Sequence, residues 1–406
     1  MRSLEIFSGA GGLAKGLELA GFEHSAFVEF NKDAYASLAV NFESNKIFFG
    51  DIKAFDLNSV SAIDLVAGGP PCQPFSLGGK HKANHDSRDM FPYAIQAIEK
   101  LAPKAFIFEN VKGLLRHNFS DYFEYIILRL TFPDFFAKPS MDWHDHLMQL
   151  RMVTKRHYSG IRYNVAFKLI NAADYGVPQT RERVVIVGIR ADLGKSWAFP
   201  EPTHSEDRLL WEMYVTGEYW QKHKIKMSHC PHIEASANEK RDYLKDRFGL
   251  FEPEFQPWKT VRDALYDVPD PRTQHRFADH IFRDGARSYA GHTGSDFDWP
   301  AKTIKAGGHG VPGGENMIRY PDGSIRYLTV FEAKRIQTFP DDFVIKGAWG
   351  EAMRQIGNAV PVLLAEVIGN RLMKILNGDT EKLARRLVSI NQPTSAVMAP
   401  VASGTN

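Results

Sequence analysis

Cysteine is scarce in this sequence of 406 residues, long apolar runs are missing, and neither sign of charge dominates. The two cysteines, Cys72 and Cys230, are too few for a disulfide framework or a four-thiolate zinc site. No apolar run approaches about 18 residues, and the start has neither a basic leader nor a long apolar segment, so we expect no membrane span and a cytoplasmic location. With 44% hydrophobic and 12% aromatic residues, the composition excludes wholesale disorder.

The near-balance of 50 Lys and Arg against 48 Asp and Glu does not exclude a nucleic-acid partner. Phosphate is bound by local clusters of basic residues rather than by the net charge. Residues 151–190 hold eight Lys or Arg and two acidic residues. This segment is either a solvated surface or part of a nucleic-acid interface.

The first 190 residues alternate short apolar runs with amphipathic stretches, which predicts a doubly wound α/β domain with a parallel sheet. The opening unit is expected to be strand, glycine turn, helix and strand, because Leu13 and Leu17 have helical spacing and Gly21 follows them. The expected strands are the runs at 4–7, 26–30, 47–49, 63–67, 105–108 and 184–189.

The chain changes character after residue 191. Residues 192–300 scatter Trp, Pro and His among charges, residues 307–314 are rich in glycine, and residues 355–376 return to a helical pattern. We therefore predict a first domain at 1–191, a second, smaller and irregular domain at 192–350, a helix at 351–378 that returns to the first domain, and a tail at 379–406.

A glycine-rich turn and two acidic residues predict a cofactor that contains adenosine. Phe7-Ser8-Gly9-Ala10-Gly11-Gly12 follows the first strand and opens a helix, where glycines allow a ligand to approach the backbone. Glu29 ends the second strand, where a carboxylate can accept both hydroxyls of a ribose. Asp51-Ile52 follows the third strand and suits an adenine ring. These residues alone leave NAD and S-adenosylmethionine both open.

A cysteine held among prolines follows the fourth strand, in Gly68-Gly69-Pro70-Pro71-Cys72-Gln73-Pro74-Phe75-Ser76. Prolines restrict the backbone and so lower the entropy cost of holding the thiol in place. Ligands of such sheets bind at the carboxyl ends of the strands, so this thiol is expected to face the cofactor crevice. The other cysteine lies in His229-Cys230-Pro231-His232, where we expect no metal site because two His and one Cys have no distant partners.

With these motifs in place, the chain resembles the DNA (cytosine-5) methyltransferase family of the bacterial restriction-modification type. The segments FSGAGGL, GGPPCQPFS, ENV at 109–111, QTRER at 179–183, RYLTVFEAKRIQTFP at 326–340 and GNAVPVLLAEVIG at 357–369 are similar to family motifs and occur in the family's order. The resemblance implies an S-adenosylmethionine-dependent methyltransferase domain built on a Rossmann-like sheet. It also implies a smaller target-recognition domain at 192–350 and no metal ion.

The resemblance also implies roles for individual residues. Cys72 would add to carbon 6 of cytosine, Glu109 would protonate or hydrogen-bond the ring nitrogen, and Arg183, with Arg181, would hold the carbonyl oxygen of the base. The implied cofactor-binding residues are Phe7, Ser8, Gly9, Gly11, Gly12, Leu13, Glu29, Phe30, Asp51, Ile52, Pro70, Phe91, Asn358 and Ala359. The implied DNA-binding residues are Ser76, Lys80, His81, Lys82, Arg88 and Gln179.

The implied partner is double-stranded DNA from which the target cytosine is flipped out, and the protein is expected to be a monomer that shares its site with a cognate restriction endonuclease. The alternatives are the tRNA-methylating branch of the superfamily, a catalytically silent DNA-binding relative, and an NAD dehydrogenase, which leaves the cysteine motif unexplained. The long segment between QTRER and the last motif favours DNA.

The chain departs from the family's pattern at three places. Thr329-Val330-Phe331-Glu332 stands where the family often has Thr-Pro-Arg-Glu, which puts an arginine-mediated support in doubt. Phe30 replaces a frequent tryptophan. Residues 131–163 form an extra stretch that the core fold does not require.

Overall fold

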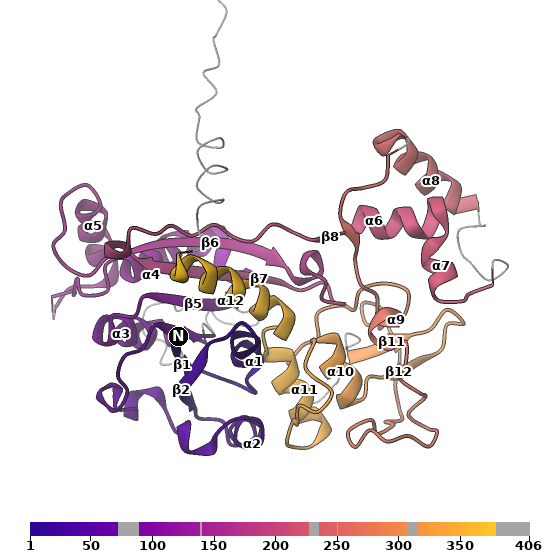
Figure 1. Cartoon of the computed structure of the whole chain (residues 1–406), viewed down its shortest axis with the longest axis horizontal. Helices are drawn as coiled ribbons and strands as arrows, with labels where there is room; N and C mark the ends of the chain where they lie inside the picture. The colour runs from indigo at the N-terminus through magenta and orange to yellow at the C-terminus, as the bar shows by residue number, and fades with distance from the viewer. Residues whose placement is uncertain (72–88, 139, 227–234, 250, 307–315, 379–406) are drawn as a thin grey trace, which may run out of the picture.

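The computed structural model describes residues 1–71, 89–138, 140–226, 235–249, 251–306 and 316–378. Its larger lobe is built on a seven-stranded sheet in the order β3-β2-β1-β4-β5-β7-β6 (Figure 1). In that order the strands are Ile47–Phe49, Glu23–Glu29, Arg2–Ile6, Leu65–Gly68, Ala105–Val111, Glu182–Arg190 and Tyr163–Asn171. This arrangement confirms the predicted α/β class.

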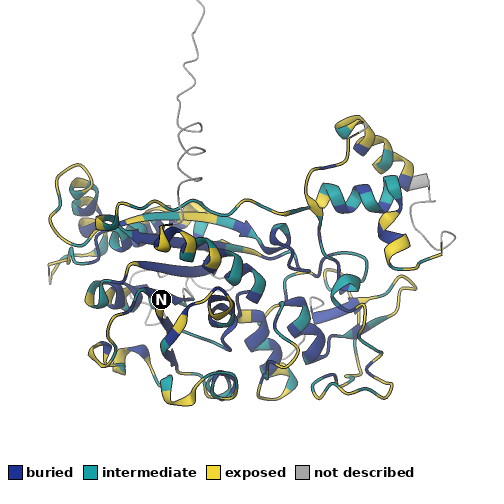
Figure 2. Ribbon diagram, in the orientation of Figure 1, coloured by how far each residue is buried: buried dark blue, intermediate teal, exposed yellow. Residues whose placement is uncertain are grey.

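Helices cover both faces of the central strands β1, β4, β5 and β7, which are therefore largely buried and apolar, whereas the edge strands β3 and β6 are partly exposed. One face packs against α3 (Phe91–Leu101) and α4 (Ser120–Thr131), and the other against α1 (Gly12–Leu19) and α12 (Val362–Asn377). Figure 2 shows the buried strands between helices whose outer sides are exposed. Helix α2 (Lys32–Asn41) flanks β2, and α5 (Trp143–Val153) packs on α4.

Helices α1 and α12 approach each other closely because glycine lies at their contact. A Cβ atom added at Gly16 would lie 2.4 Å from Ala365 Cβ and 2.4 Å from the Val362 carbonyl oxygen. The equivalent atom at Gly369 would lie 2.8 Å from Ala20 Cβ. The single helix predicted at 351–378 is two helices, Trp349–Asn358 and Val362–Asn377, and this contact ties the second of them to the first helix of the chain.

The predicted parallel sheet is confirmed for β1 to β5 and wrong in the direction of one predicted strand. All six predicted strands are present, but β7 runs antiparallel to β5, and β6, which was not predicted, runs antiparallel to β7. Residue Tyr163, assigned to a dispensable stretch at 131–163, begins β6 and is 1% exposed. Part of that stretch is therefore core, because its side chains pack under the sheet beside α4.

The smaller lobe contains short elements around two apolar clusters. Its helices are α6 (Glu206–Trp211), α7 (Glu218–Lys222), α8 (Ala235–Phe248), α9 (Val261–Ala264), α10 (Val330–Ile336) and α11 (Trp349–Asn358). Its strands are β8 (His204–Ser205), β9 (Gln256–Pro257), β10 (Ser295–Asp296), β11 (Met317–Arg319) and β12 (Ile325–Tyr327). Helices α6 to α8 group at the upper right of Figure 1, away from α5 at the left. One cluster joins Ala10 of the large lobe to residues on both sides of the predicted boundary at 350.

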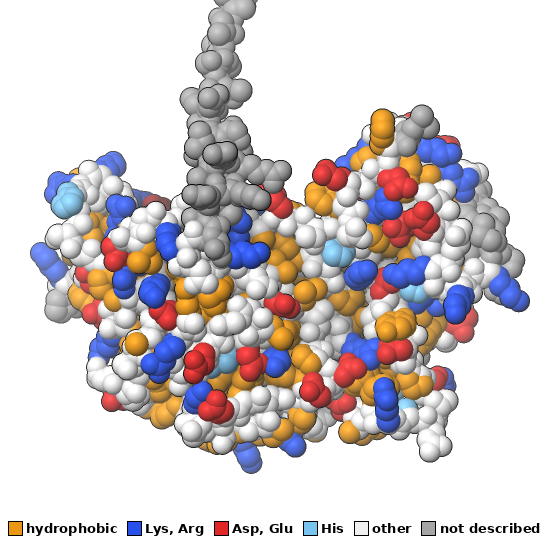
Figure 3. Space-filling model, viewed as in Figure 1, with side chains coloured by type: hydrophobic (Ala, Val, Ile, Leu, Met, Phe, Trp, Pro, Cys, Tyr) orange, Lys and Arg blue, Asp and Glu red, His pale blue; other side chains and the backbone are white. Residues whose placement is uncertain are grey.

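Among the described residues, every helix is too short or too polar to cross a membrane. On the face drawn in Figure 3, acidic and basic side chains are interspersed rather than separated, in keeping with the small net charge.

Candidate functional site

Five strands bring the sequence-predicted residues to one edge of the sheet. The register pairs Ile6 with Val28 and with Gly68, and Gly68 with Phe108. The residues that follow these, Phe7, Glu29, Gly69 and Glu109, therefore stand side by side at the carboxyl ends of β1, β2, β4 and β5. Because β7 is antiparallel, its beginning lies at the same edge, and Arg183 pairs with Val111.

The glycine turn after β1 is held by Glu29. The backbone N–H of Gly9 donates to Glu29 Oε2 at 2.7 Å, and that of Asn31 donates to Oε1 at 2.7 Å. Phe7 and Gly11 have φ angles of 53° and 90°, values that favour glycine and at Phe7 mark backbone strain. A turn strained in this way and held to Glu29 through Gly9 leaves its backbone at the sheet edge, where a ligand could approach it.

Glu29 is only 6% exposed. Burial raises the pKa of this carboxyl, while the backbone N–H groups of Asn31 and Gly9 and the charge of Arg354 offset part of the rise. A carboxylate has about four acceptor positions, so after these two hydrogen bonds it can still accept hydroxyl groups. The position and chemistry of Glu29 therefore suit a ribose.

The last family-like motif touches the glycine turn. A Cβ atom added at Gly12 would lie 2.5 Å from the Val360 carbonyl oxygen and 3.0 Å from Ala359 Cβ, so the turn accepts no larger residue there. Asn358, at the end of α11, is exposed beside this contact. Residues about 350 positions apart in the sequence thus meet at this end of the sheet.

The other predicted cofactor residues divide into exposed and buried ones. Phe30 is 70% exposed, which leaves its ring free to stack, and Asp51 accepts the N–H of Lys53 at the start of a short helix that buries Ile52. Ser8 donates its hydroxyl to the Glu5 carbonyl oxygen at 2.9 Å. Leu13 and Phe91 lie in the two apolar clusters on opposite faces of the sheet, at 8% and 1% exposure.

Glu109 and Arg183 form an ion pair at the edge. Arg183 Nε lies 2.7 Å from Glu109 Oε1, and the side chains are 13% and 10% exposed. A Cβ atom added at Gly69 would lie 3.6 Å from Glu109 Oε2, so the chain leading to Cys72 starts beside this carboxylate. The pair places a carboxylate and a guanidinium next to each other where both are largely shielded from solvent.

The segment that carries Cys72 is anchored at both of its ends. Asn110 donates its side-chain N–H to the Pro70 carbonyl oxygen at 2.9 Å, and the Met90 N–H donates to the Pro71 carbonyl oxygen at 3.2 Å. Sequence reasoning did not single out Asn110, although it stands in the ENV motif. Cys72 itself, the predicted DNA contacts Ser76, Lys80, His81, Lys82 and Arg88, and residues 229–232 lie outside the described residues.

Two predicted residues are placed differently from the prediction. Arg181 is fully buried and donates to the carbonyl oxygens of Ile304, at 3.2 Å, and Gly357, at 2.7 Å. Gln179 is also fully buried, and its side-chain oxygen accepts the Ile304 N–H at 3.3 Å. Since both side chains are enclosed by residues 301–304 and the end of α11, the structure opposes direct contacts of Arg181 with a base and of Gln179 with DNA.

The motif that departs from the family pattern in the small lobe contains an arginine–carboxylate contact of its own. Phe331 is buried and stacks on Phe277 at 4.2 Å, while Arg326 Nη2 lies 2.5 Å from Glu332 Oε1. Arg326 thus supplies the arginine–carboxylate contact on Glu332. Arg326 lies in strand β12, within the same family-like motif, so this motif contained the residue from which the contact could have been predicted.

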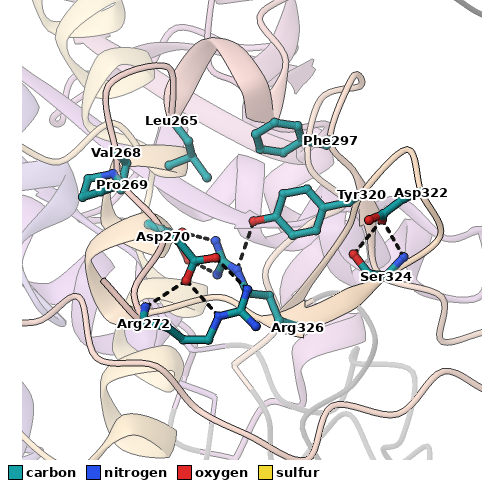
Figure 4. Close-up of a pocket in the computed structure, with 11 residues that line it drawn as sticks. Leu265, Val268, Pro269, Asp270, Arg272, Phe297, Tyr320, Asp322, Ser324 and Arg326 are labelled. Carbon is teal, nitrogen blue, oxygen red and sulfur yellow. Dashed lines mark hydrogen bonds and ion pairs between the residues drawn. The ribbon is translucent and has the colours of Figure 1, made fainter. Parts of the chain in front are cut away.

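A recess of about 370 Å³ lies between residues 265–272 and the β11–β12 hairpin (Figure 4). Four of its five charged side chains are paired with each other, Arg272 with Asp270 and Arg326 with Glu332, and the fifth, Asp322, accepts hydrogen bonds from Ser324. None of the sequence-predicted site residues lines it. Among the described residues, no group of three or more His, Cys, Asp or Glu is arranged to hold a metal ion.

Comparisons with known proteins give a matching family, similar sequences and a similar fold. The family described as C-5 cytosine-specific DNA methylase matches residues 1–141 and 144–374. The chain is 30% identical over 377 residues to the Type II methyltransferase M.NgoMIV of Neisseria gonorrhoeae, covering 92% of this chain and 97% of the relative. It is 31% identical to the Type II methyltransferase M.Sau96I of Staphylococcus aureus, covering 92% and 76%. In fold it is similar to the Dnmt2 methyltransferase of S. pombe, with a TM-score of 0.58, 16% identity and coverage of 93% and 99%.

Proposed function

Because this chain belongs to the C-5 cytosine-specific DNA methylase family, we propose that it methylates carbon 5 of a cytosine within a specific sequence of duplex DNA. The proposed methyl donor is S-adenosylmethionine, and the proposed intermediate is a covalent cysteine adduct on a flipped-out base. The observation that carries this proposal is the Glu109–Arg183 ion pair. It lies beside Gly69, at the same edge of the sheet as Glu29 and the glycine turn.

The residues at the edge fit the proposed donor. Glu29 would accept the ribose hydroxyls, Phe30 and Ile52 would enclose the adenine, and the turn at Gly9–Gly12 with Asn358 would line the remaining part. S-adenosylmethionine supplies an electrophilic methyl group. The product left in this crevice would be S-adenosylhomocysteine.

The chain's own residues would prepare the cytosine for that methyl group. The Cys72 thiolate would form a bond to carbon 6, and the electron pair displaced from the ring would move toward the ring nitrogen, where Glu109 would hydrogen-bond or protonate it. Arg183 would hold the carbonyl oxygen of the base and keep Glu109 in position. After methylation, loss of the proton from carbon 5 and breaking of the sulfur–carbon bond would restore the thiol.

Arg181 would act as a positioning residue in this scheme. Its two hydrogen bonds join residues 301–304 of the small lobe to Gly357, which directly precedes Asn358. It would therefore fix the relative position of the cofactor rim and the strand that carries Arg183.

The proposed partners follow from the proposed DNA methyltransferase function. Double-stranded DNA would bind between the sheet edge and the smaller lobe, which we propose recognises the target sequence. We further propose a cytoplasmic monomer that is the modification half of a restriction-modification system, sharing its site with a cognate endonuclease.

The decisive experiment is methylation of duplex DNA in vitro followed by sequencing at base resolution. The proposal predicts 5-methylcytosine at one recurring sequence, and it predicts more transfer to duplex DNA than to tRNA assayed in parallel. A covalent complex with DNA that has fluorine at carbon 5 of the target cytosine would demonstrate the adduct. Methylation of tRNA alone, or no adduct with active protein, would reject the DNA assignment or the covalent step respectively.

A further inference from the structure

An exposed ion pair flanks the Glu109–Arg183 pair and has no part in the scheme above. Lys112 Nζ lies 2.7 Å from Glu182 Oε2, and the two side chains are 60% and 47% exposed. Lys112 begins the short helix Lys112–Leu115 directly after β5, and Glu182 is the first residue of β7. The pair therefore lies at the same sheet edge as the proposed active site.

The Lys112–Glu182 and Glu109–Arg183 ion pairs lie on opposite faces of the sheet. Side chains alternate between the faces of a strand, so Glu182 points away from the face that carries Arg183. Arg183 is paired with Val111 in the sheet, and Lys112 follows directly. Two further exposed basic residues, Arg116 and His117, come next in the chain. The edge beyond Glu109 thus offers exposed basic side chains, and Glu182 pairs with one of them, Lys112.

The physical chemistry favours exchange of this pair with a phosphate. An ion pair between exposed side chains contributes about 0–1 kcal/mol, so it is easily broken. A lysine that contacts a DNA phosphate also releases condensed counterions, which adds a salt-dependent gain. A flipped base remains joined to its own sugar and phosphates, so the backbone that carries it must pass the rim of the pocket.

We propose that Lys112 binds a backbone phosphodiester next to the flipped cytosine, and that Glu182 holds Lys112 in the free protein and releases it when DNA binds. The inference rests on the proposed function, because it needs a base held at Glu109 and Arg183. It adds a binding residue and a competing acidic residue that the family-like motifs alone did not predict. Glu182 lowers DNA affinity, since its pairing with Lys112 must be broken first.

The test compares Lys112→Gln and Glu182→Gln with a matched ion pair at the opposite edge of the same sheet. Lys104 Nζ lies 2.7 Å from Asp64 Oδ1, and these residues directly precede β5 and β4. Lys104→Gln and Asp64→Asn are therefore the controls. Affinity is measured by fluorescence anisotropy between about 50 and 200 mM salt, on the duplex whose site the sequencing experiment identifies.

Lys112→Gln is expected to weaken binding about three- to tenfold and to reduce the salt slope by about one, whereas both controls bind as the unaltered protein does. Glu182→Gln is expected to tighten binding. The loss caused by Lys112→Gln should be larger when Glu182→Gln is also present, because no pair then has to be broken.

Equal effects of Lys112→Gln and Lys104→Gln would overturn the inference, and so would strictly additive effects of the two substitutions at Lys112 and Glu182. Failure of the proposed function has a different signature, since the unaltered protein would then neither methylate nor selectively bind the duplex. Unchanged binding of S-adenosylmethionine by each variant shows that the fold is intact.

Discussion

Replacing Arg181 by methionine separates a structural role from a catalytic one. The side chain is fully buried, and its two terminal nitrogens donate to the carbonyl oxygens of Ile304 and Gly357. Burial lowers the pKa of this guanidinium to about 9, so it remains charged at neutral pH. Hydrogen bonds to a charged group contribute about 1.5–3 kcal/mol each, or about 3–6 kcal/mol for the two.

Methionine has a similar length and spares the cost of burying a charge, which offsets part of that loss. We therefore expect Arg181→Met to lower the free energy of unfolding by about 2–4 kcal/mol. In urea denaturation followed by circular dichroism, the midpoint should fall while the slope stays unchanged. The affinity for S-adenosylmethionine should fall as well, because Gly357 positions Asn358.

Arg183→Met is the matched control for this substitution. Arg183 lies at the open end of β7 and pairs with Glu109, so its loss should remove methyl transfer and lower the midpoint less than Arg181→Met does. If Arg181→Met unfolds at the same urea concentration as the unaltered protein, binds cofactor and DNA normally and yet transfers no methyl group, then Arg181 acts on the base and the positioning role is wrong.

Three further outcomes are expected. Cys72→Ala should abolish methyl transfer and leave DNA binding largely intact in a gel-shift assay, and retained turnover would refute the nucleophile. Titration calorimetry should show that the affinity for S-adenosylmethionine falls on acidification through the pKa of Glu29, which burial raises, because the neutral acid accepts ribose hydroxyls poorly. The Glu29→Gln variant should bind weakly, and its affinity should not change with pH. A pH-dependent affinity in that variant would exclude Glu29 as the cause. Gly16→Val should lower the free energy of unfolding by at least about 1–3 kcal/mol, because its Cβ would meet Ala365 and Val362 on α12. The control is the same change at Gly350, where nothing lies within 4 Å of an added Cβ and φ is not positive.

The strands and the cofactor edge were predictable because their signals are local. Each strand is a short apolar run, and the glycine turn and Glu29 adjoin such runs, so their meeting at one edge follows from a parallel arrangement of β1 and β2. The positions of Arg181 and Gln179 were not predictable in the same way. They are buried by Ile304 and Gly357, more than 120 residues further along, and a local motif shows the residue type but not what will enclose it.

The antiparallel direction of β7 could have been inferred from function. Glu109 stands in the last part of its strand, whereas the arginines of QTRER stand at or before the start of theirs. In a parallel strand, Arg183 would lie beside Ala105, four residues from Glu109 along the sheet or roughly 13 Å at about 3.3 Å per residue, and could not meet Glu109. If both side chains act on one base, the two strands must run in opposite directions. On the proposed roles, the register that places Arg183 opposite Val111 is therefore required, and the proposal would explain why the sheet departs from the parallel pattern at this position.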